Sequence, residues 1–308
     1  MTRSLPTNGT SSDYPQVQND VPYSEESSLN TLDICIPRLN NPNHDPLWIV
    51  FIHGGAWQDP AISASSFRKT QDLLLDSSEI KSIAGLASLN YRLSPYPAHE
   101  TDPSNPADPA RNAKHPDHIN DVLTAILYLQ ERYLFQDRYI LVGHSVGATL
   151  AFQVAMKRYW GVQYESTYAL ELNVEPPLAI LGVEGIYDLP ALVKYHRKEP
   201  VYEGFVSNAN GSDSAVWKAV SPVEGLYEQS WPDGRLVVIA HSHGDELVEW
   251  EQAELMVAAL EGQGWDDKSD ARHLKVLEMT GKHDQVWEEG GELARAIVTT
   301  LQGIQAMA

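Results

Sequence analysis

The five residues Gly143-His144-Ser145-Val146-Gly147 have the G-x-S-x-G spacing that places a nucleophilic serine on a sharp turn. A serine hydroxyl is a weak nucleophile, so it must be held where a general base can take its proton. An apolar strand-like run ends at this motif and a helix-forming run follows it, which is the setting that such a turn requires. The sequence therefore predicts Ser145 as the nucleophile of an acyl-transfer reaction, although short Gly/Ser patterns also arise by chance.

A second motif, His53-Gly54-Gly55-Ala56-Trp57, follows another strand-like run upstream of the serine. Two glycines allow the backbone N–H groups to approach a substrate carbonyl oxygen, and the N–H of Val146 is expected to complete an oxyanion hole. We therefore predict His53, Gly54, Gly55 and Val146 as substrate-binding residues. We expect Trp57 to provide an aromatic wall for the substrate, with simple core packing as the alternative.

The turn around Ser145 is typical of a fold in which the nucleophile, the acid and the histidine follow one another in that order along the chain. The general base is therefore expected to be a histidine that comes after Ser145 and after the acid. His273 and His283 both satisfy this order. His283 follows the strand-like run Leu274–Met279, whereas His273 precedes it and is expected at the opposite end of that strand. We predict His283 as the base.

Two aspartates are candidates for the acid. Asp188 follows one strand-like run, and Asp245 follows the next, which directly precedes the strand of the histidine. A carboxylate in that position can accept the imidazole Nδ1–H and fix its tautomer, so we predict Asp245 as the acid. Asp188 is expected to line a pocket or to cap a helix.

Two histidine groups could instead indicate a metal site. His241, His243 and Asp245 have an H-x-H-x-D spacing found in binuclear metallohydrolases, but Glu246 follows where another histidine is usual. His115 and His118 are a weaker pair, for which packing within a loop is expected. Because a serine pathway is complete without them, we predict no metal and no other cofactor.

Strand-like and helical segments alternate along most of the chain, which predicts an α/β protein with a mostly parallel sheet and helices on both faces. Together with the serine turn, this pattern favours the α/β-hydrolase fold. We expect residues 1–28 to be an irregular N-terminal extension and residues 29–308 to form one catalytic domain, with insertions near 94–116 and 201–230 at the active site. Both insertions interrupt the alternation with proline-rich or polar sequence.

Composition excludes several classes of function. The 308 residues carry a formal net charge of -20, which disfavours binding to nucleic acid or to anionic membranes. No apolar stretch approaches the length of a membrane span, and the N-terminus has no signal-peptide pattern. The single cysteine, Cys35, lies in an apolar run and is expected to be a buried, reduced thiol. We therefore expect a cytoplasmic protein, and the sequence leaves a homodimer open.

From about Leu29 to its C-terminus, the chain resembles the kynurenine formamidases, also called arylformamidases, especially those of fungi. The most specific match is His53-Gly54-Gly55-Ala56-Trp57, because related esterases usually carry a third glycine at the position of Ala56. Weaker matches are the segments 90–94, 115–121 and 185–189. The long proline-rich insertion between Tyr96 and Lys114 departs from the family and puts the substrate preference in doubt.

The resemblance implies a small-molecule substrate, N-formyl-L-kynurenine, and hydrolysis of its formamide to L-kynurenine and formate. Two alternatives stay open at this point. A carboxylesterase acting on short acyl esters would use the same residues. A non-catalytic relative that only binds a ligand is the alternative from a different class, although such relatives usually lose one member of the triad.

Overall fold

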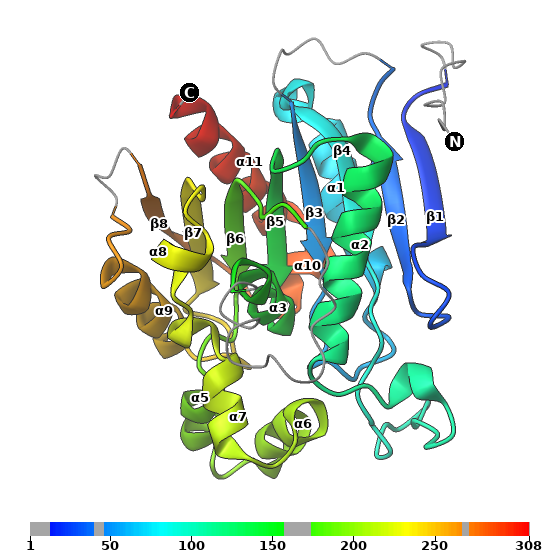
Figure 1. Cartoon of the computed structure of the whole chain (residues 1–308), viewed down its shortest axis with the longest axis vertical. Coiled ribbons are helices and arrows are strands. Elements are labelled where there is room, and N and C mark those ends of the chain that lie inside the picture. The colour runs from blue at the N-terminus through cyan, green and yellow to red at the C-terminus, as the bar shows by residue number, and fades with distance from the viewer. Residues whose placement is uncertain (1–12, 40–45, 157–173, 267–270, 308) are drawn as a thin grey trace.

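A computed structural model of the chain describes residues 13–39, 46–156, 174–266 and 271–307. An eight-stranded sheet forms its centre, in the order β1-β2-β4-β3-β5-β6-β7-β8 (Figure 1). The strands are β1 (Gln16–Pro22), β2 (Thr31–Ile36), β3 (Leu47–Ile52), β4 (Ile83–Leu89), β5 (Tyr139–His144), β6 (Ala179–Val183), β7 (Leu236–Ser242) and β8 (His273–Met279). All neighbouring pairs from β4 to β8 are parallel, whereas β2 pairs antiparallel with both β4 and β1.

The strand β1 corrects the prediction of an irregular extension over residues 1–28. Residues Gln16–Pro22 pair with β2 at the edge of the sheet, and most of their side chains are exposed. An edge strand that is mostly exposed lacks the apolar run by which strands are recognised in a sequence. Residues 1–12 of that predicted extension lie outside the described ranges.

Helices cover both faces of the sheet, as predicted. The helices α2 (Asp117–Tyr133), α3 (Val146–Ala155) and α9 (Glu251–Glu261) pack on one face, and α1 (Arg68–Leu75), α10 (Gln285–Glu289) and α11 (Gly291–Ala306) on the other. In Figure 1, α2 and α3 lie in front of the sheet and α11 behind it. In the described residues, no helix is long and apolar enough to span a bilayer.

Strand β5 illustrates how the sheet divides the core. All six of its residues are buried, and their side chains alternate between the two faces: Tyr139 and Leu141 join the core under α2 and α3, while Ile140 and Val142 join the core under α11. A strand covered on both sides must be apolar throughout, which explains why its sequence does not alternate. Cys35 of β2 is also fully buried, as predicted, and burial raises the pKa of its thiol to about 11.

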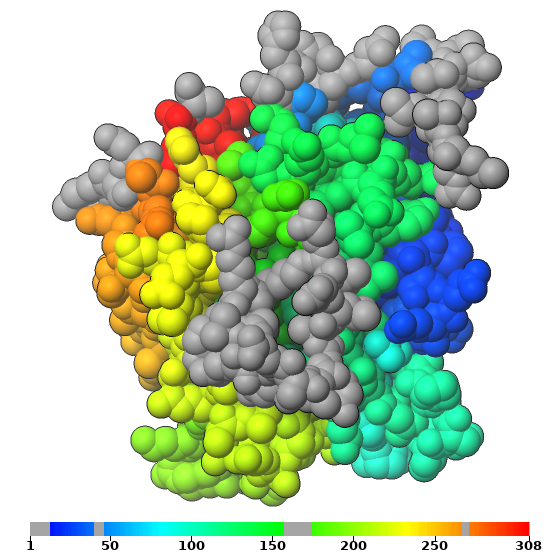
Figure 2. Space-filling view, in the orientation of Figure 1, coloured from blue at the N-terminus to red at the C-terminus, as the bar shows by residue number. Residues whose placement is uncertain are grey.

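The two predicted insertions lie together at one end of the molecule. The chain between β6 and β7 forms the helices α5 (Leu189–Tyr195), α6 (Pro200–Asn210), α7 (Ser214–Val220) and α8 (Tyr227–Ser230), while 94–116 is mostly loop. Figures 1 and 2 show residues 94–116 and α5 to α7 at the lower end. Asn208 of α6 donates a 3.0 Å hydrogen bond to the carbonyl of Pro95, which joins the two segments.

Candidate active site

Ser145 lies on a sharp turn between β5 and α3. Its backbone adopts φ 56° and ψ −124°, a conformation that residues other than glycine rarely adopt. The Ser145 N–H donates to the carbonyl of Val183 (2.9 Å), and the Ser145 carbonyl accepts from Ala148 N–H (3.0 Å). These bonds at the strand end and at the helix start hold the strained turn in place.

The two glycines of the motif are required by close contacts between the strand and the helix. A Cβ atom on Gly143 would lie 2.2 Å from the carbonyl oxygen of Gly147, and one on Gly147 would lie 2.2 Å from that of Ile52. Both distances are far below van der Waals contact, so only glycine allows this approach. The strand–turn–helix that the sequence predicts around Ser145 is confirmed.

The loop after β3 lies against this turn. A Cβ atom on Gly54 would come within 2.9 Å of the Ser145 Cβ, and Gly55 has a φ of +87° that favours glycine. The hydroxyl of Tyr91 donates to the carbonyl oxygens of His53 and Gly54, at 3.0 Å each. The loop is therefore fixed from one side by Tyr91 and borders the serine on the other.

Asp245 and His283, the predicted acid and base, lie within hydrogen-bond distance of each other. The Asp245 Oδ2 accepts a 2.8 Å hydrogen bond from His283 Nδ1, while its Oδ1 accepts from the N–H groups of Leu247 and Val248 at 2.9 Å each. The carboxylate side chain is fully buried. With its proton on Nδ1, the imidazole leaves Nε2 able to accept a proton.

The alternative acid and the alternative base lie elsewhere. Asp188 is the N-cap of α5, where its side chain accepts a hydrogen bond from Ala191 N–H (2.9 Å). His273 is the first residue of β8 and lies at the opposite end of that strand from His283. Strand direction thus separates His273 from His283, whereas Asp188 is taken up by the cap of α5.

A pocket of about 300 Å³ opens where the parallel strands end, and both Ser145 and His283 line it. Gly55 and Val146 lie beside them in its wall. The remaining wall is largely apolar and includes Tyr96, Ile186, Tyr202, Phe205, Leu247 and Val248. Tyr96 comes from the 94–116 segment and Phe205 from α6, so both predicted insertions contribute side chains to this pocket.

His53 and Trp57 do not line the pocket, which corrects their prediction as substrate contacts. Trp57 has a positive φ of 59° and is 2% exposed, packed near His118 and Phe205. The ring of His53 is buried and stacks on Tyr91 at 4.5 Å. Burial lowers the pKa of His53 to about 4, so the ring is neutral at pH 7. Both side chains are therefore packed in the interior, beneath the loop that they belong to.

Comparison with known proteins identifies the family of the chain. The family model described as BD-FAE matches residues 32–260. A kynurenine formamidase-like hydrolase of Fusarium equiseti is 40% identical over 293 residues, covering 92% of this chain and 94% of that protein. A kynurenine formamidase of Aspergillus versicolor is 39% identical, with 91% and 98% covered. The chain belongs to the kynurenine formamidase family.

The family resemblance predicted from the His53–Trp57 motif is thereby confirmed, and this family member is a hydrolase. Solved structures share its fold: esterase B of Lactobacillus rhamnosis has a TM-score of 0.66 at 14% identity, covering 95% of this chain and 84% of that one. An esterase of Thermogutta terrifontis has a TM-score of 0.59 at 18% identity, with 93% and 92% covered. The predicted α/β-hydrolase fold is confirmed.

Glu184 lies close to His283 and was not among the residues predicted from the sequence. It follows β6 directly, has a positive φ of 46° and is fully buried. Its Oε2 lies 3.8 Å from His283 Nδ1 and 3.6 Å from His144 Nε2. The one signal in the sequence is its place at the end of a strand next to that of Asp245.

One group of side chains in the described ranges has metal-ligand spacing, and it consists of His144, Glu184 and His283. However, His283 Nδ1 already donates to Asp245, and His144 Nε2 lies 3.1 Å from the carbonyl oxygen of His283. A cation bound through His283 Nδ1 would break the Asp245–His283 hydrogen bond.

Of the alternative metal group, His241 Nε2 and Asp245 Oδ2 lie 3.4 Å apart, but His243 does not join them. His243 is 62% exposed and stacks on Trp250, whereas His241 is buried and bonded to the carbonyl of Val248. His118 Nε2 is bonded to the hydroxyl of Ser94, 3.0 Å away, in the core. These histidines therefore pack and position loops.

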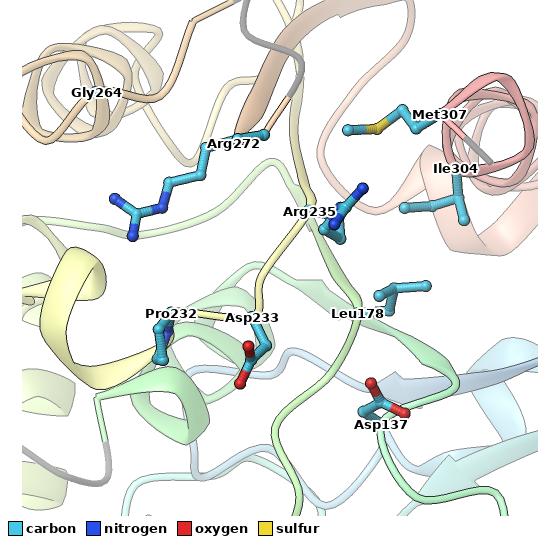
Figure 3. Close-up of a pocket in the computed structure, with 10 residues that line it drawn as sticks. Asp137, Leu178, Pro232, Asp233, Arg235, Gly264, Arg272, Ile304 and Met307 are labelled. Carbon is cyan, nitrogen blue, oxygen red and sulfur yellow. The ribbon is translucent and has the colours of Figure 1, made fainter.

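Another cavity, of about 660 Å³, lies at the opposite end of the strands (Figure 3). Its wall includes Leu178, Arg235 and Arg272, which directly precede β6, β7 and β8. It contains no serine, histidine or cysteine in its wall. The predicted nucleophile and base, Ser145 and His283, line the other pocket.

Proposed function

We propose that this member of the kynurenine formamidase family hydrolyses the formamide of N-formyl-L-kynurenine, releasing L-kynurenine and formate. The observation that carries the proposal is the 39–40% identity over more than nine-tenths of the chain to proteins named kynurenine formamidase or formamidase-like hydrolase. The serine turn and the Asp245–His283 pair supply the groups that such a reaction needs. This step belongs to tryptophan breakdown.

In the proposed mechanism, His283 Nε2 takes the proton of the Ser145 hydroxyl as its oxygen attacks the formyl carbon. Asp245 stabilises the resulting imidazolium through the 2.8 Å hydrogen bond to Nδ1. The imidazolium then protonates the aniline nitrogen of the leaving L-kynurenine. Water, deprotonated by the same histidine, attacks the formyl-enzyme and releases formate.

The negative oxygen of the tetrahedral intermediate is proposed to lie between the N–H groups of Gly55 and Val146. Val146 is the first residue of α3, so its N–H has no acceptor within the helix and points out of the helix N-terminus. Such preorganised donors typically contribute about 3–4 kcal/mol each to the stabilisation of the transition state. Gly54 keeps the loop close enough to the serine to place its neighbour there.

We propose that the aromatic ring of the substrate packs against Tyr96, Tyr202 and Phe205, in place of Trp57. These side chains line the same pocket as Ser145, and Tyr202 lies 5.5 Å from Phe205, ring centre to ring centre. An aromatic wall favours an aryl formamide over an aliphatic ester of similar size. This preference separates the proposed function from the alternative of a short-chain carboxylesterase.

The substrate of the proposed reaction is a small molecule. We also propose that the enzyme is located in the cytosol. The formal charge of -20 opposes binding to nucleic acid, and a buried, unpaired Cys35 is compatible with a reducing compartment. Fractionation of cells that express a tagged chain tests this location.

The test compares two substrates at matched concentrations, N-formyl-L-kynurenine and 4-nitrophenyl acetate. We expect kcat/KM to be higher for the formamide and both activities to be lost in Ser145→Ala. Good hydrolysis of the ester with no hydrolysis of the formamide would assign the chain to the esterases instead.

A further inference from the structure

The carboxyl group of Glu184 lies behind the proposed base and has no assigned role. Strands β5, β6, β7 and β8 are neighbours in the sheet, so the chain just beyond their carboxyl ends meets in one place. Glu184 follows β6, and Asp245 and His283 follow β7 and β8. Two carboxyl groups therefore approach the same imidazole nitrogen, Asp245 at 2.8 Å and Glu184 at 3.8 Å.

The surroundings of Glu184 do not account for a structural role. Its side chain is fully buried, and neither carboxyl oxygen has a hydrogen-bond partner within the described ranges. Its backbone N–H donates to the carbonyl of Ala240 (2.8 Å), a bond that any residue could make. A buried, unpaired carboxyl on a positive-φ residue is costly, and such groups gather at functional sites.

The groups that face Glu184 come from every neighbouring element. They are His144 of β5, His283 and Asp284 after β8, Asp245 and Glu246 after β7, and Glu292 of α11. Burial, followed by the charge of Asp245, raises the pKa of Glu184 to about 9. With its pKa raised in this way, Glu184 holds its proton at pH 7.

We propose that Glu184 is a positioning residue of the active site, a second carboxyl group that supports His283 from the neighbouring strand. The inference rests on the proposed function, in which His283 is the base. In the resting enzyme, the neutral carboxyl of Glu184 supplies a dipole near Nδ1. When the charge of Asp245 is removed, the pKa of Glu184 falls and its carboxylate takes over part of the stabilisation of the imidazolium.

The experiment is a double-mutant cycle of Asp245→Asn and Glu184→Gln, with Glu292→Gln as the matched control. Glu292 also carries a carboxyl group near Glu184, but it is bonded to Arg295 on α11. Activity is measured with N-formyl-L-kynurenine and with 4-nitrophenyl acetate from pH 5 to pH 10. Ser145→Ala is included as the test of the active site itself.

We expect Asp245→Asn to retain activity that rises with pH and exceeds that of the double variant about tenfold. Glu184→Gln alone is expected to lower kcat about 3- to 10-fold with little change in KM, whereas Glu292→Gln matches the wild type. When Glu184→Asp replaces Glu184→Gln in the double variant, a carboxyl group is present again, and we expect part of the rise of activity with pH to return. An infrared band of a protonated carboxyl group, lost in Glu184→Gln, provides a readout that does not depend on activity.

Two results would overturn the inference on its own: equal activity of Asp245→Asn and the double variant at every pH, or a wild-type kcat in Glu184→Gln with only its stability changed. Full activity of Ser145→Ala would instead refute the proposed function, and the inference about Glu184 would fail with it.

Discussion

Gly54 gives the sharpest prediction, because its effect can be worked out from contacts alone. In Gly54→Ala, the added Cβ would lie 2.9 Å from the Ser145 Cβ and 3.0 Å from His144 Nδ1, whereas ordinary contacts begin at 3.4 Å. The loop and the serine turn must separate by about half an ångström. The φ of Gly54 lies outside the left-handed region, so the effect is steric and not a matter of backbone strain.

Displacing reacting groups by about 1 Å can reduce a rate by about 100-fold, and sites tolerate shifts of about 0.5 Å. We therefore expect Gly54→Ala to lower kcat by about 10- to 100-fold, equivalent to about 1.4–2.7 kcal/mol in the activation barrier. Overpacking at this position is expected to cost about 1–3 kcal/mol in the free energy of unfolding.

The assay measures kcat for N-formyl-L-kynurenine and the rate of labelling by a fluorophosphonate, both well below the melting temperature. Gly291→Ala is the matched control, because a Cβ at Gly291 would have no heavy atom within 4 Å. If Gly54→Ala retains the kcat and labelling rate of Gly291→Ala, the loop does not border the reacting serine and the reasoning is refuted.

Three further predictions follow from the same contacts. Tyr91→Phe removes the hydroxyl that donates to the carbonyl oxygens of His53 and Gly54 at 3.0 Å. We expect a loss of about 1–3 kcal/mol in the free energy of unfolding, measured by urea denaturation, and a lower kcat, measured by steady-state kinetics. Unchanged values of both would contradict the role of Tyr91. Tyr96→Ala removes an aromatic side chain from the pocket wall, and KM for the formamide should rise up to about tenfold with a smaller change in kcat, whereas an unaltered KM would place the ring elsewhere. Because the folded-state pKa of Glu184 is raised from 4.5 to about 9, its contribution to stability is complete below pH 4.5 and is lost as the pH rises through 9. Glu184→Gln should therefore flatten the fall in unfolding free energy over this range, by at most about 1.4 kcal/mol per pH unit, and parallel curves for the two proteins would argue against a protonated Glu184.

Much of the site could be predicted from the sequence because its elements carry local signals. The motif around Ser145 combines a buried apolar strand with two glycines that the close approach of strand and helix requires. Strand direction then separated His283 from His273, and chain order favoured Asp245 over Asp188. The first inference depends on which end of a parallel strand a residue occupies, and the second on which strand directly precedes that of the histidine.

The features that the sequence did not predict depend on contacts distant along the chain. Strand β1 is held by backbone pairing at an exposed edge, which leaves no apolar pattern in Gln16–Pro22. Trp57 turns into the core because of a positive φ that a motif of residue types does not specify. Glu184 approaches His283 only because β6 and β8 flank β7 in the sheet.

The most direct test of the central claim measures formate and L-kynurenine released from N-formyl-L-kynurenine by the purified chain and by Ser145→Ala. We predict equimolar release of both products by the wild type, and a rate lower by about 10³-fold or more in Ser145→Ala. Equal rates for the two proteins, or no hydrolysis of the formamide by the wild type, would contradict the claim that Ser145 makes this chain a formamidase.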